Sequence, residues 1–297
     1  MTGPVPPVAG DPGDGIVARL RAAGCVWAED EAALLESAAR TPSELEALVA
    51  RRAGGEPLEL VLGWVEFLGR RLVVTPGVFV PRRRTELLAR TTIAEVVTRS
   101  RVAGAGPVVA VEMCCGVAPV AAALHATAAE VHAADVSAAA LDCARQNAPT
   151  TLLHHGDLFD ALPAGLRGRV GVLAANAPYV PTDRISSMPP EAREHEPRVA
   201  LDGGTDGVDL HRRLSAEATD WLVPGGVLLV ETSRSQAPLT TAAMAAAGLD
   251  THVVVDPELG GCVAVGVKDQ SMTGGAGVTI PTSASASSIC SREMPSR

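Results

Sequence analysis

Hydrophobic residues change their spacing along this 297-residue chain. Between Gly15 and Gly54, apolar side chains recur every three or four residues, which is typical of amphipathic helices. From Pro107 onward, short apolar runs rich in valine, leucine and alanine alternate with helical stretches. Strands that alternate with helices predict a parallel sheet with helices on both faces.

Three short helices are predicted in the first of these regions. The third begins at Thr41-Pro42-Ser43-Glu44, where Thr41 is the expected N-cap, proline lies in the first turn and glutamate follows three residues after the cap. We expect a small helical domain over residues 13–63 and a β-hairpin over residues 64–75 that turns near Gly69.

Seven strands are predicted in the alternating region. They are expected at residues 108–113, 131–135, 152–155, 170–175, 227–231, 251–255 and 262–267. Helices are expected at residues 85–99, 117–126, 137–147, 210–221 and 238–247, with a long loop from Pro181. No helix separates the last two strands, so they should pair antiparallel at one edge. This pattern predicts an α/β fold of the class I methyltransferase type, a Rossmann-like seven-stranded sheet with an antiparallel edge strand.

The remaining segments have compositions typical of disorder. Residues 1–12 contain four prolines and little to bury, so we expect a disordered leader. Residues 269–297 are rich in serine, threonine and glycine, and we expect a disordered tail there. The predicted methyltransferase domain spans residues 76–268.

Composition limits the kind of partner. The net charge of −9 argues against broad binding to nucleic acid, because that affinity comes largely from neutralising phosphates. No apolar run is long enough to cross a bilayer, the N-terminus lacks the pattern of a signal peptide, and the six cysteines show no paired metal-ligand spacing. We expect a cytoplasmic, monomeric protein with no metal, membrane or nucleic-acid partner.

Polar residues at the strand ends are candidates for a nucleotide pocket. Residues 112–119 join the first strand to its helix, where a Rossmann-type fold uses glycines, but Cys114 and Ala118 occupy two of the three glycine positions around Gly116. Asp135 ends the second strand, where an acid can accept hydrogen bonds from ribose hydroxyls. Asp157 follows the third strand, where it could face an adenine amino group. An ordinary strand-to-helix turn and a capping role for Asp157 remain alternatives.

The fourth strand is followed by Asn176-Ala177-Pro178-Tyr179, which contains the only tyrosine of the chain. By itself this motif is more often a turn that ends a strand, because asparagine and proline are common turn residues. Its position at the carboxyl end of a predicted parallel strand makes it a candidate catalytic loop. Phe159, two residues after Asp157, is a further candidate that could lie against an adenine ring.

Together these segments resemble the protein N5-glutamine methyltransferases that modify peptide-chain release factors, the HemK/PrmC family, and lie nearest a side branch known only as protein N5-glutamine methyltransferases. The resemblance covers about residues 15–268. Besides Asn-x-Pro-Tyr, it rests on three segments: Gly55-Glu56-Pro57-Leu58 with Gly63 and Glu66-Phe67; Pro76-Gly77-Val78-Phe79-Val80-Pro81-Arg82 with Thr85-Glu86; and Glu196-Pro197-Arg198 through Leu201-Asp202-Gly203-Gly204 to Asp206-Gly207.

The resemblance implies that S-adenosylmethionine is the cofactor, that the helical domain recognises a release-factor-like protein, and that a glutamine side-chain amide of that protein is methylated. The catalytic loop would be Asn176, Ala177, Pro178 and Tyr179. In the family's terms, the Asn176 side-chain oxygen and the Ala177 carbonyl would accept hydrogen bonds from the amide, and Tyr179 would pack on the amide plane. The implied cofactor contacts are Glu112, Cys114, Gly116, Asp135, Val136, Asp157, Leu158 and Asn176. The implied substrate contacts are Asn176, Tyr179, Arg82, Glu196 and Arg198.

Two departures from the family pattern bear on activity. Ala177 replaces a proline, but its role is a backbone carbonyl, so the expected cost is loop rigidity. The side chains of Cys114 and Ala118 are expected to crowd the methionine part of the cofactor, which predicts weaker binding or lost activity.

Three other functions stay open. Adenine N6-methyltransferases use a similar loop, and Arg82-Arg83-Arg84 could contact phosphates, although the acidic charge and the 2% aromatic content favour a protein substrate. A methyltransferase-like protein that only binds a partner would explain the glycine-poor loop. An enzyme acting on a small amide-bearing metabolite or peptide is the third possibility.

Overall fold

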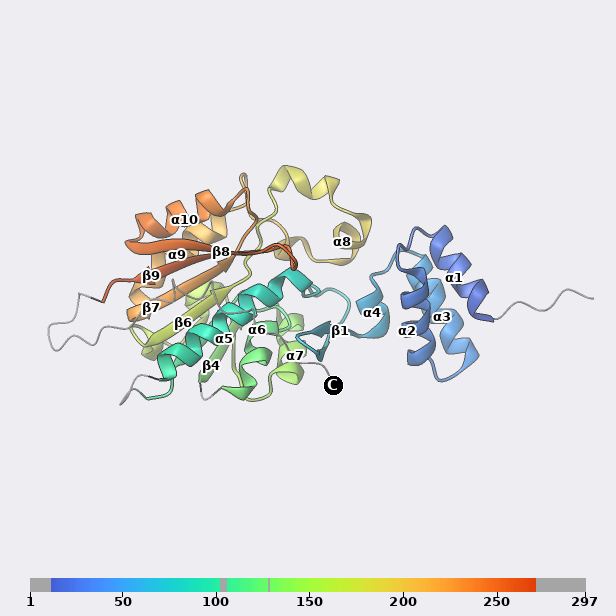
Figure 1. Ribbon diagram of the computed structural model, residues 1–297, viewed down its shortest axis with the longest axis horizontal. Helices are drawn as coiled ribbons and strands as arrows, with labels where there is room; N and C mark the ends of the chain where they lie inside the picture. The colour runs from blue at the N-terminus through green and yellow to red at the C-terminus, as the bar shows by residue number, and fades with distance from the viewer. Residues whose placement is uncertain (1–11, 102–105, 128, 271–297) are drawn as a thin grey trace, which may run out of the picture.

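The computed structural model describes residues 12–101, 106–127 and 129–270. The leader predicted over residues 1–12 and the tail predicted over residues 269–297 lie almost entirely outside these ranges. A helical bundle, a β-hairpin and an α/β sheet follow one another along the chain (Figure 1).

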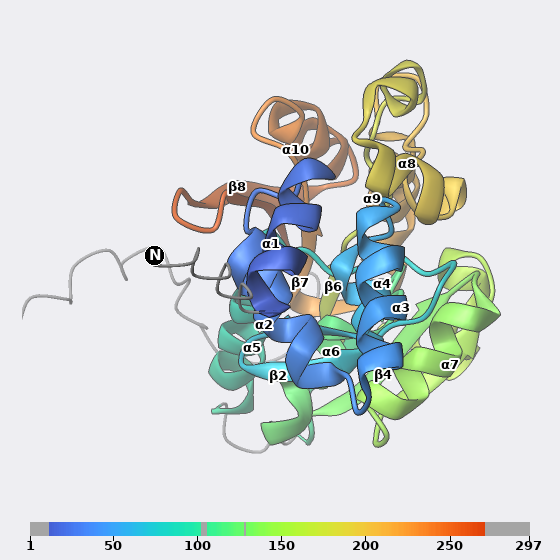
Figure 2. The ribbon, with the colours of Figure 1, turned by 90° about the vertical axis from the view of Figure 1, so that its right-hand side faces the viewer.

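The N-terminal helices pack around a small core of their own. They are α1 (Pro12–Ala22), α2 (Ala28–Ala38), α3 (Pro42–Ala53) and the short α4 (Leu58–Leu62), which the sequence pattern did not predict. Leu20, Leu35 and Val49 are fully buried in this core. Thr41 caps α3 as predicted, because its Oγ1 accepts a hydrogen bond from the Glu44 amide at 3.1 Å. Seen from the side of the bundle, these helices lie in front of the sheet (Figure 2).

The predicted hairpin connects the bundle to the sheet. Strands β1 (Trp64–Phe67) and β2 (Arg70–Val73) pair antiparallel, and both turn residues, Leu68 and Gly69, have positive φ angles, as in a two-residue type I′ turn. Asn147, at the end of a sheet-domain helix, accepts a hydrogen bond from the Val73 amide at 2.7 Å and donates one to the Val73 carbonyl at 3.0 Å. These two bonds attach the hairpin to the sheet domain.

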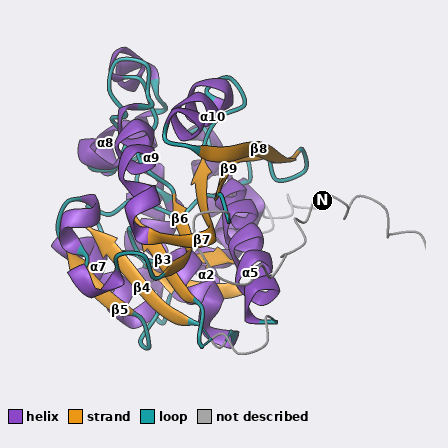
Figure 3. Cartoon of the chain, turned by 90° about the vertical axis from the view of Figure 1, so that its left-hand side faces the viewer, coloured by secondary structure: helices purple, strands orange, loops and turns teal. Residues whose placement is uncertain are grey.

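The main sheet confirms the predicted fold class. Its seven strands run in the order β5-β4-β3-β6-β7-β9-β8 (Figure 3). They are β3 (Val109–Met113), β4 (Glu130–Asp135), β5 (Leu152–His155), β6 (Val170–Ala175), β7 (Leu222–Glu231), β8 (Leu249–Asp256) and β9 (Gly261–Lys268). Strands β3 to β7 are parallel, and the reversed strand β9 lies between β7 and the edge strand β8.

Helices cover both faces of this sheet. They are α5 (Glu86–Ser100), α6 (Pro119–Ala123), α7 (Ala138–Asn147), α9 (Asp209–Trp221) and α10 (Ala237–Ala246). Leu88 of α5 and Leu141 of α7 belong to one buried core, and Leu214 of α9 and Met244 of α10 belong to the other. Neighbouring strand residues alternate between the two cores, so both faces of the sheet are buried.

Two local predictions were wrong. The stretch after Pro181, expected as a plain loop, contains α8 (Pro190–His195), which begins at a proline suited to a first helical turn. Strand β7 begins at Leu222, five residues earlier than predicted. Pro224 and the two glycines after it do not end the pairing with β6; they lie within the strand, at a shift in its register. Shorter 3₁₀ turns are η1 (Arg83–Thr85), η2 (Leu124–Ala126), η3 (Leu158–Ala161), η4 (Ala164–Leu166), η5 (Thr182–Ser187) and η6 (Arg198–Ala200).

Candidate active site

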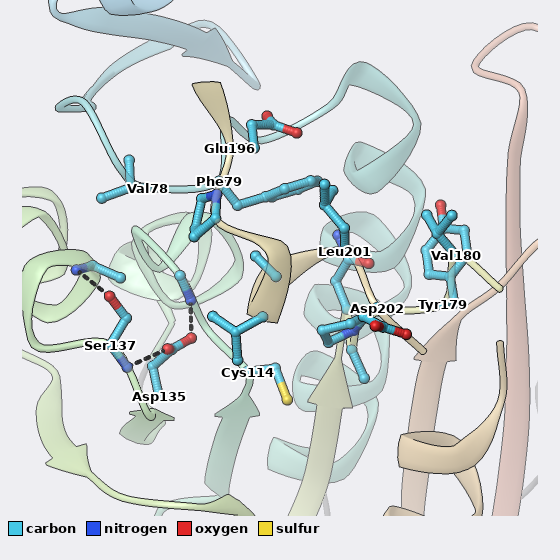
Figure 4. Close-up of a pocket in the computed structure, with 18 of the residues that line it drawn as sticks. Val78, Phe79, Cys114, Asp135, Ser137, Tyr179, Val180, Glu196, Leu201 and Asp202 are labelled. Carbon is cyan, nitrogen blue, oxygen red and sulfur yellow. Dashed lines mark hydrogen bonds between the residues drawn. The ribbon is translucent and has the colours of Figure 1, made fainter. Parts of the chain in front are cut away.

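A pocket of about 1340 Å³ lies at the carboxyl ends of the central strands. Strands β3 and β6 are neighbours, and the chain leaves them toward opposite sides of the sheet, so the pocket lies at the topological switch point where α/β proteins bind ligands. The close-up shows the pocket framed by the β4 end, the loop after β6 and the segment around α8 (Figure 4).

The structure brings the sequence-predicted site residues to this one pocket. Its lining includes Arg82, Glu112, Cys114, Gly116, Asp135, Val136, Asp157, Leu158, Asn176, Ala177, Pro178, Tyr179, Glu196 and Arg198. Phe159 lies elsewhere: it is buried and stacks on Trp221 with ring centroids 5.4 Å apart, so it is not placed to meet an adenine ring.

Glu112 shapes the loop after β3 through helix α6. Its Oε1 accepts a hydrogen bond from the Val120 amide at 3.1 Å, and its Oε2 accepts one from the Ala121 amide at 2.7 Å. These are unpaired donors of the first helical turn, so the carboxyl group caps the helix. Burial raises the pKa of Glu112 to about 8, although the two amide donors oppose the shift.

The loop keeps a glycine-type backbone although only one of its three glycine positions is occupied by glycine. Cys114, Gly116 and Ala118 have φ angles of 53°, 55° and 61°, all in the left-handed region. For the two residues with side chains, this conformation costs roughly 1–2 kcal/mol each. Ala118 is fully buried in the core rather than lining the pocket, so the expected crowding by its methyl group is wrong; Cys114 does line the pocket.

Asp135 links this loop to the end of β4. Its Oδ2 accepts a hydrogen bond from the Gly116 amide at 2.7 Å, and its Oδ1 accepts one from the Ser137 amide at 2.8 Å (Figure 4). Burial raises the pKa of Asp135, and these amide donors partly offset the effect. Val136, 46% exposed, adds an apolar surface beside it. Asp157 is exposed and pairs with Arg213 at 2.8 Å.

The loop after β6 is held by residues far away in the sequence. The Asn176 Nδ2 donates to the Thr85 hydroxyl at 3.4 Å. The Tyr179 hydroxyl accepts a hydrogen bond from Arg84 Nε at 2.9 Å and donates to Glu231 Oε1 at 3.2 Å. Burial raises the pKa of Tyr179 to about 12, so its hydroxyl stays protonated at neutral pH.

A buried histidine lies beside the same loop. The His211 ring centroid is 6.3 Å from that of Tyr179, and His211 Nδ1 shares a hydrogen bond of 2.9 Å with Thr240. Among the described residues, His211 Nε2 has no hydrogen-bond partner. Burial lowers the pKa of His211 to about 4, so the imidazole is neutral at physiological pH.

Sequence reasoning gave no role at this loop to Arg84, Thr85, Glu231 or His211, and considered Arg84 only as a phosphate contact; in the structure all four lie at or beside the loop after β6. Of these, Glu231 had a usable signal, because it ends an apolar strand with a carboxyl group as Asp135 does.

The far end of the pocket is rich in paired charges. The Glu196 side chain is 1% exposed, and its Oε1 accepts hydrogen bonds from Arg82 at 2.6 Å and from the Val80 amide at 3.2 Å. Among the described residues, Glu196 Oε2 has no partner. Each arginine that lines the pocket in the described chain pairs with a carboxylate: Arg82 with Glu196, Arg84 with Glu231, Arg198 with Asp202 and Arg213 with Asp157.

Clusters of metal-ligating side chains and membrane-spanning helices are both absent from the described ranges. Residues 12–101, 106–127 and 129–270 contain no group of three or more histidine, cysteine, aspartate or glutamate side chains arranged to hold a metal ion. None of the helices in these ranges combines the length and the apolar character needed to cross a membrane.

Comparisons with known proteins agree with this geometry. No protein-family model matches the chain. A release factor glutamine methyltransferase of Geobacter sulfurreducens is 38% identical over 73% of this chain and 76% of its own length. A 4-amino-L-phenylalanine/4-methylamino-L-phenylalanine methyltransferase of Streptomyces pristinaespiralis is 37% identical over 70% of this chain and 72% of its own length. A methyltransferase structure from Pyrococcus furiosus matches the fold with a TM-score of 0.50 and 16% identity, over 68% of this chain and 90% of that chain. The fold, the strand-end residues and the similarity to the Geobacter protein lead to one conclusion: the chain belongs to the release factor glutamine methyltransferase family.

Proposed function

We propose that the protein transfers a methyl group from S-adenosylmethionine to the side-chain amide nitrogen of a glutamine within a protein of the release-factor type. The observation that carries this proposal is the orientation of Asn176. Its Nδ2 is engaged by Thr85, so its side-chain oxygen is left to accept a hydrogen bond in the same pocket that Asp135 lines.

The residues at the β3 and β4 ends fit the cofactor. Asp135 uses one lone pair of each oxygen on a backbone amide, and its remaining acceptor capacity suits ribose hydroxyls. Val136 and Leu158 supply apolar surface for adenine, with Asp157 as an acceptor at the rim. Glu112, Cys114 and Gly116 form the loop under the methionine part. When bound, S-adenosylmethionine supplies an electrophilic methyl group on a sulfonium.

The loop after β6 prepares the acceptor amide. An amide nitrogen is a poor nucleophile because its lone pair is delocalised into the carbonyl. Hydrogen bonds from its two hydrogens to Asn176 Oδ1 and the Ala177 carbonyl would increase the charge on nitrogen and fix its orientation. Tyr179 and Pro178 line the slot for the amide plane.

The helical bundle is proposed to recognise the protein that carries the glutamine. On the turn between α1 and α2, Val26 is 80% exposed and Trp27 is 69% exposed, and large exposed apolar side chains of this kind are typical of contact surfaces. At the pocket, Arg82, Glu196 and Arg198 are the proposed contacts for the segment around the glutamine. A release-factor substrate would place the enzyme in the cytoplasm.

A second candidate comes from the Streptomyces pristinaespiralis relative. An aromatic amine also has two hydrogens for Asn176 and the Ala177 carbonyl. A free amino acid, however, brings an α-carboxylate, and every arginine lining the described part of the pocket already pairs with a carboxylate. This favours an acceptor residue within a chain, whose main chain is neutral.

The decisive experiment supplies labelled S-adenosylmethionine with a release factor, free 4-amino-L-phenylalanine or an adenine-containing oligonucleotide. We expect label on a glutamine of the release factor, located by mass spectrometry. The Asn176→Ala variant should bind the cofactor like the wild type in calorimetry and lose methyl transfer. Label on the amine or the oligonucleotide alone, or unchanged turnover by Asn176→Ala, would refute the proposal.

A further inference from the structure

Gln236 is a polar residue at the start of helix α10 that the mechanism above does not use. Its Nε2 donates hydrogen bonds to the Tyr179 carbonyl at 2.8 Å and to the Asp206 carbonyl at 3.1 Å. Its Oε1 accepts one from the Ser233 hydroxyl at 2.7 Å. A glutamine amide has two hydrogens, and each of them is used here on a main-chain carbonyl. Gln236 therefore joins α10 to two other stretches of chain, one of which is the loop after β6.

The contact with Tyr179 depends on a neighbouring glycine. A Cβ on Gly207 would lie 2.2 Å from Gln236 Nε2 and 2.4 Å from the Tyr179 carbonyl oxygen, so only glycine leaves room for the amide to reach this oxygen. The φ angle of Gly207 is 79°, which also favours glycine. The Asp206-Gly207 pair, part of the sequence pattern that the chain shares with its family, thereby has a structural role beside the loop after β6.

The main chain after Tyr179 is held as well. The Val180 amide donates to the Leu201 carbonyl at 3.0 Å, and the Gly203 amide donates to the Val180 carbonyl at 2.9 Å. A Cβ on Gly203 would lie 2.7 Å from the Tyr179 Cα, so the two main chains are in direct contact. Gln236 extends this attachment by one residue, to the Tyr179 carbonyl itself.

Tyr179 is thus attached at both of its ends. Its hydroxyl is bound by Arg84 and Glu231, and its carbonyl is bound by Gln236. The ring cannot turn or shift without breaking one of these bonds. In the proposed function this ring packs on the plane of the acceptor amide, and a misplacement of about 1 Å at a reacting centre can reduce the rate roughly 100-fold.

We propose that Gln236 is a positioning residue for methyl transfer, which holds the main chain of Tyr179 so that its ring lies against the acceptor amide. This inference rests on the proposed function. Gln236 lies outside the lining of the described pocket, so it acts through Tyr179 rather than by touching the substrate.

Gln236→Met tests the proposal with little change in the length of the side chain. The variant has no hydrogen to donate, so the Tyr179 carbonyl loses this partner. We expect kcat to fall by about tenfold, while the KM for the acceptor and the dissociation constant of S-adenosylmethionine change by less than about twofold. The unchanged cofactor affinity shows that the variant is folded. Gln146→Met is the matched control: Gln146 Nε2 also donates to a main-chain carbonyl, that of Asp142 at 3.3 Å in helix α7, so kcat should stay near the wild-type value.

A second arm asks whether Gln236 acts through Tyr179. In a Tyr179→Ala background the ring is absent, so Gln236→Met should add less than about a twofold loss of kcat. A full additive loss in that background, wild-type kcat in Gln236→Met, an equal loss in Gln146→Met, or a parallel loss of cofactor binding would overturn the proposal. Label on the free amine or the oligonucleotide alone would instead refute the proposed function, which wild-type enzyme by itself can show.

Discussion

Arg52 of helix α3 and Glu191 of helix α8 form an ion pair, with Nη1 and Oε1 2.7 Å apart, across 139 residues of sequence. Arg52 is buried and also binds Glu31 of α2, with Nε and Oε2 2.5 Å apart. Helix α8 immediately precedes Glu196, which lines the far end of the pocket. The bundle is therefore linked directly to the part of the site assigned to the acceptor.

Removing this link should weaken recognition of a protein acceptor but not of the cofactor. Glu191 is half exposed, so Glu191→Ala should change stability by no more than about 1 kcal/mol. We expect the KM for a protein acceptor to rise about two- to fivefold, the range that such an ion pair supplies. Steady-state kinetics with the full-length protein acceptor and with a short peptide that contains the glutamine would measure the change in KM for each.

Glu194→Ala is the matched control, because Glu194 lies on the same helix but pairs with its neighbour Arg193. An equal rise of KM in Glu194→Ala, or in the short-peptide assay, would show that the link has no role in recognition.

Restoring glycine at Cys114 should stabilise the protein. A φ of 53° strains an L-residue by roughly 1–2 kcal/mol. A glycine there avoids this strain, and ordering its more flexible backbone on folding costs only about 0.5–1 kcal/mol. We expect Cys114→Gly to raise the free energy of unfolding by up to about 1 kcal/mol, measured by denaturant titration, and to bind S-adenosylmethionine at least as tightly as the wild type.

Ala118→Gly should gain less, because the methyl group of Ala118 is fully buried and its removal loses packing. Ala123→Gly, at an ordinary helical position of α6, should cost about 1 kcal/mol. Destabilisation by Cys114→Gly would contradict a strained loop.

His211 should make stability depend on acid. Burial lowers the pKa of His211 from 6.5 to about 4 in the folded protein, so between these values the unfolded chain binds the proton more readily. Its contribution to stability is complete above pH 6.5 and is lost as the pH falls toward 4, by about 1.4 kcal/mol per pH unit. Urea unfolding of the wild type and of His211→Gln across this range should show the steeper decline in the wild type. His252→Gln, at an exposed site on β8, should behave like the wild type; parallel curves for His211→Gln would disprove the assignment.

Glu196 should contribute to acceptor affinity through its unpaired oxygen. A buried carboxylate oxygen without a partner in the described structure is suited to an N–H donor of the bound segment. We expect Glu196→Gln to raise the KM for the protein acceptor by roughly tenfold, in line with the loss of one charge-assisted hydrogen bond, and to leave the cofactor dissociation constant unchanged. Equal losses in both constants would indicate a collapsed pocket instead.

The sequence predicted those site residues that directly follow an apolar run. Asp135 and Asn176 are such residues, and the parallel sheet brings their strand ends to the same edge. The pattern of apolar runs could not predict contacts between distant segments. Arg84 and Glu231 are 147 residues apart in the sequence, and only the folded sheet brings them together. The three glycine-type positions around Gly116 were predicted from spacing, but not their backbone conformation, because alanine and cysteine rarely adopt positive φ. Helix α8 was missed because six residues are too few to show a hydrophobic period.

The charges around the pocket also affect the release of the used cofactor. In the described part of the chain, seven carboxyl groups (Glu59, Asp135, Asp157, Glu191, Glu196, Asp202 and Asp209) line the pocket besides Glu112, whose raised pKa favours its neutral form, against four guanidinium groups (Arg82, Arg84, Arg198 and Arg213). Methyl transfer turns the sulfonium of S-adenosylmethionine into the neutral thioether of S-adenosylhomocysteine, so turnover removes a positive charge from acidic surroundings. The surrounding charge therefore attracts the fresh cofactor more than the spent one, which favours exchange after each cycle, and added salt should reduce this preference.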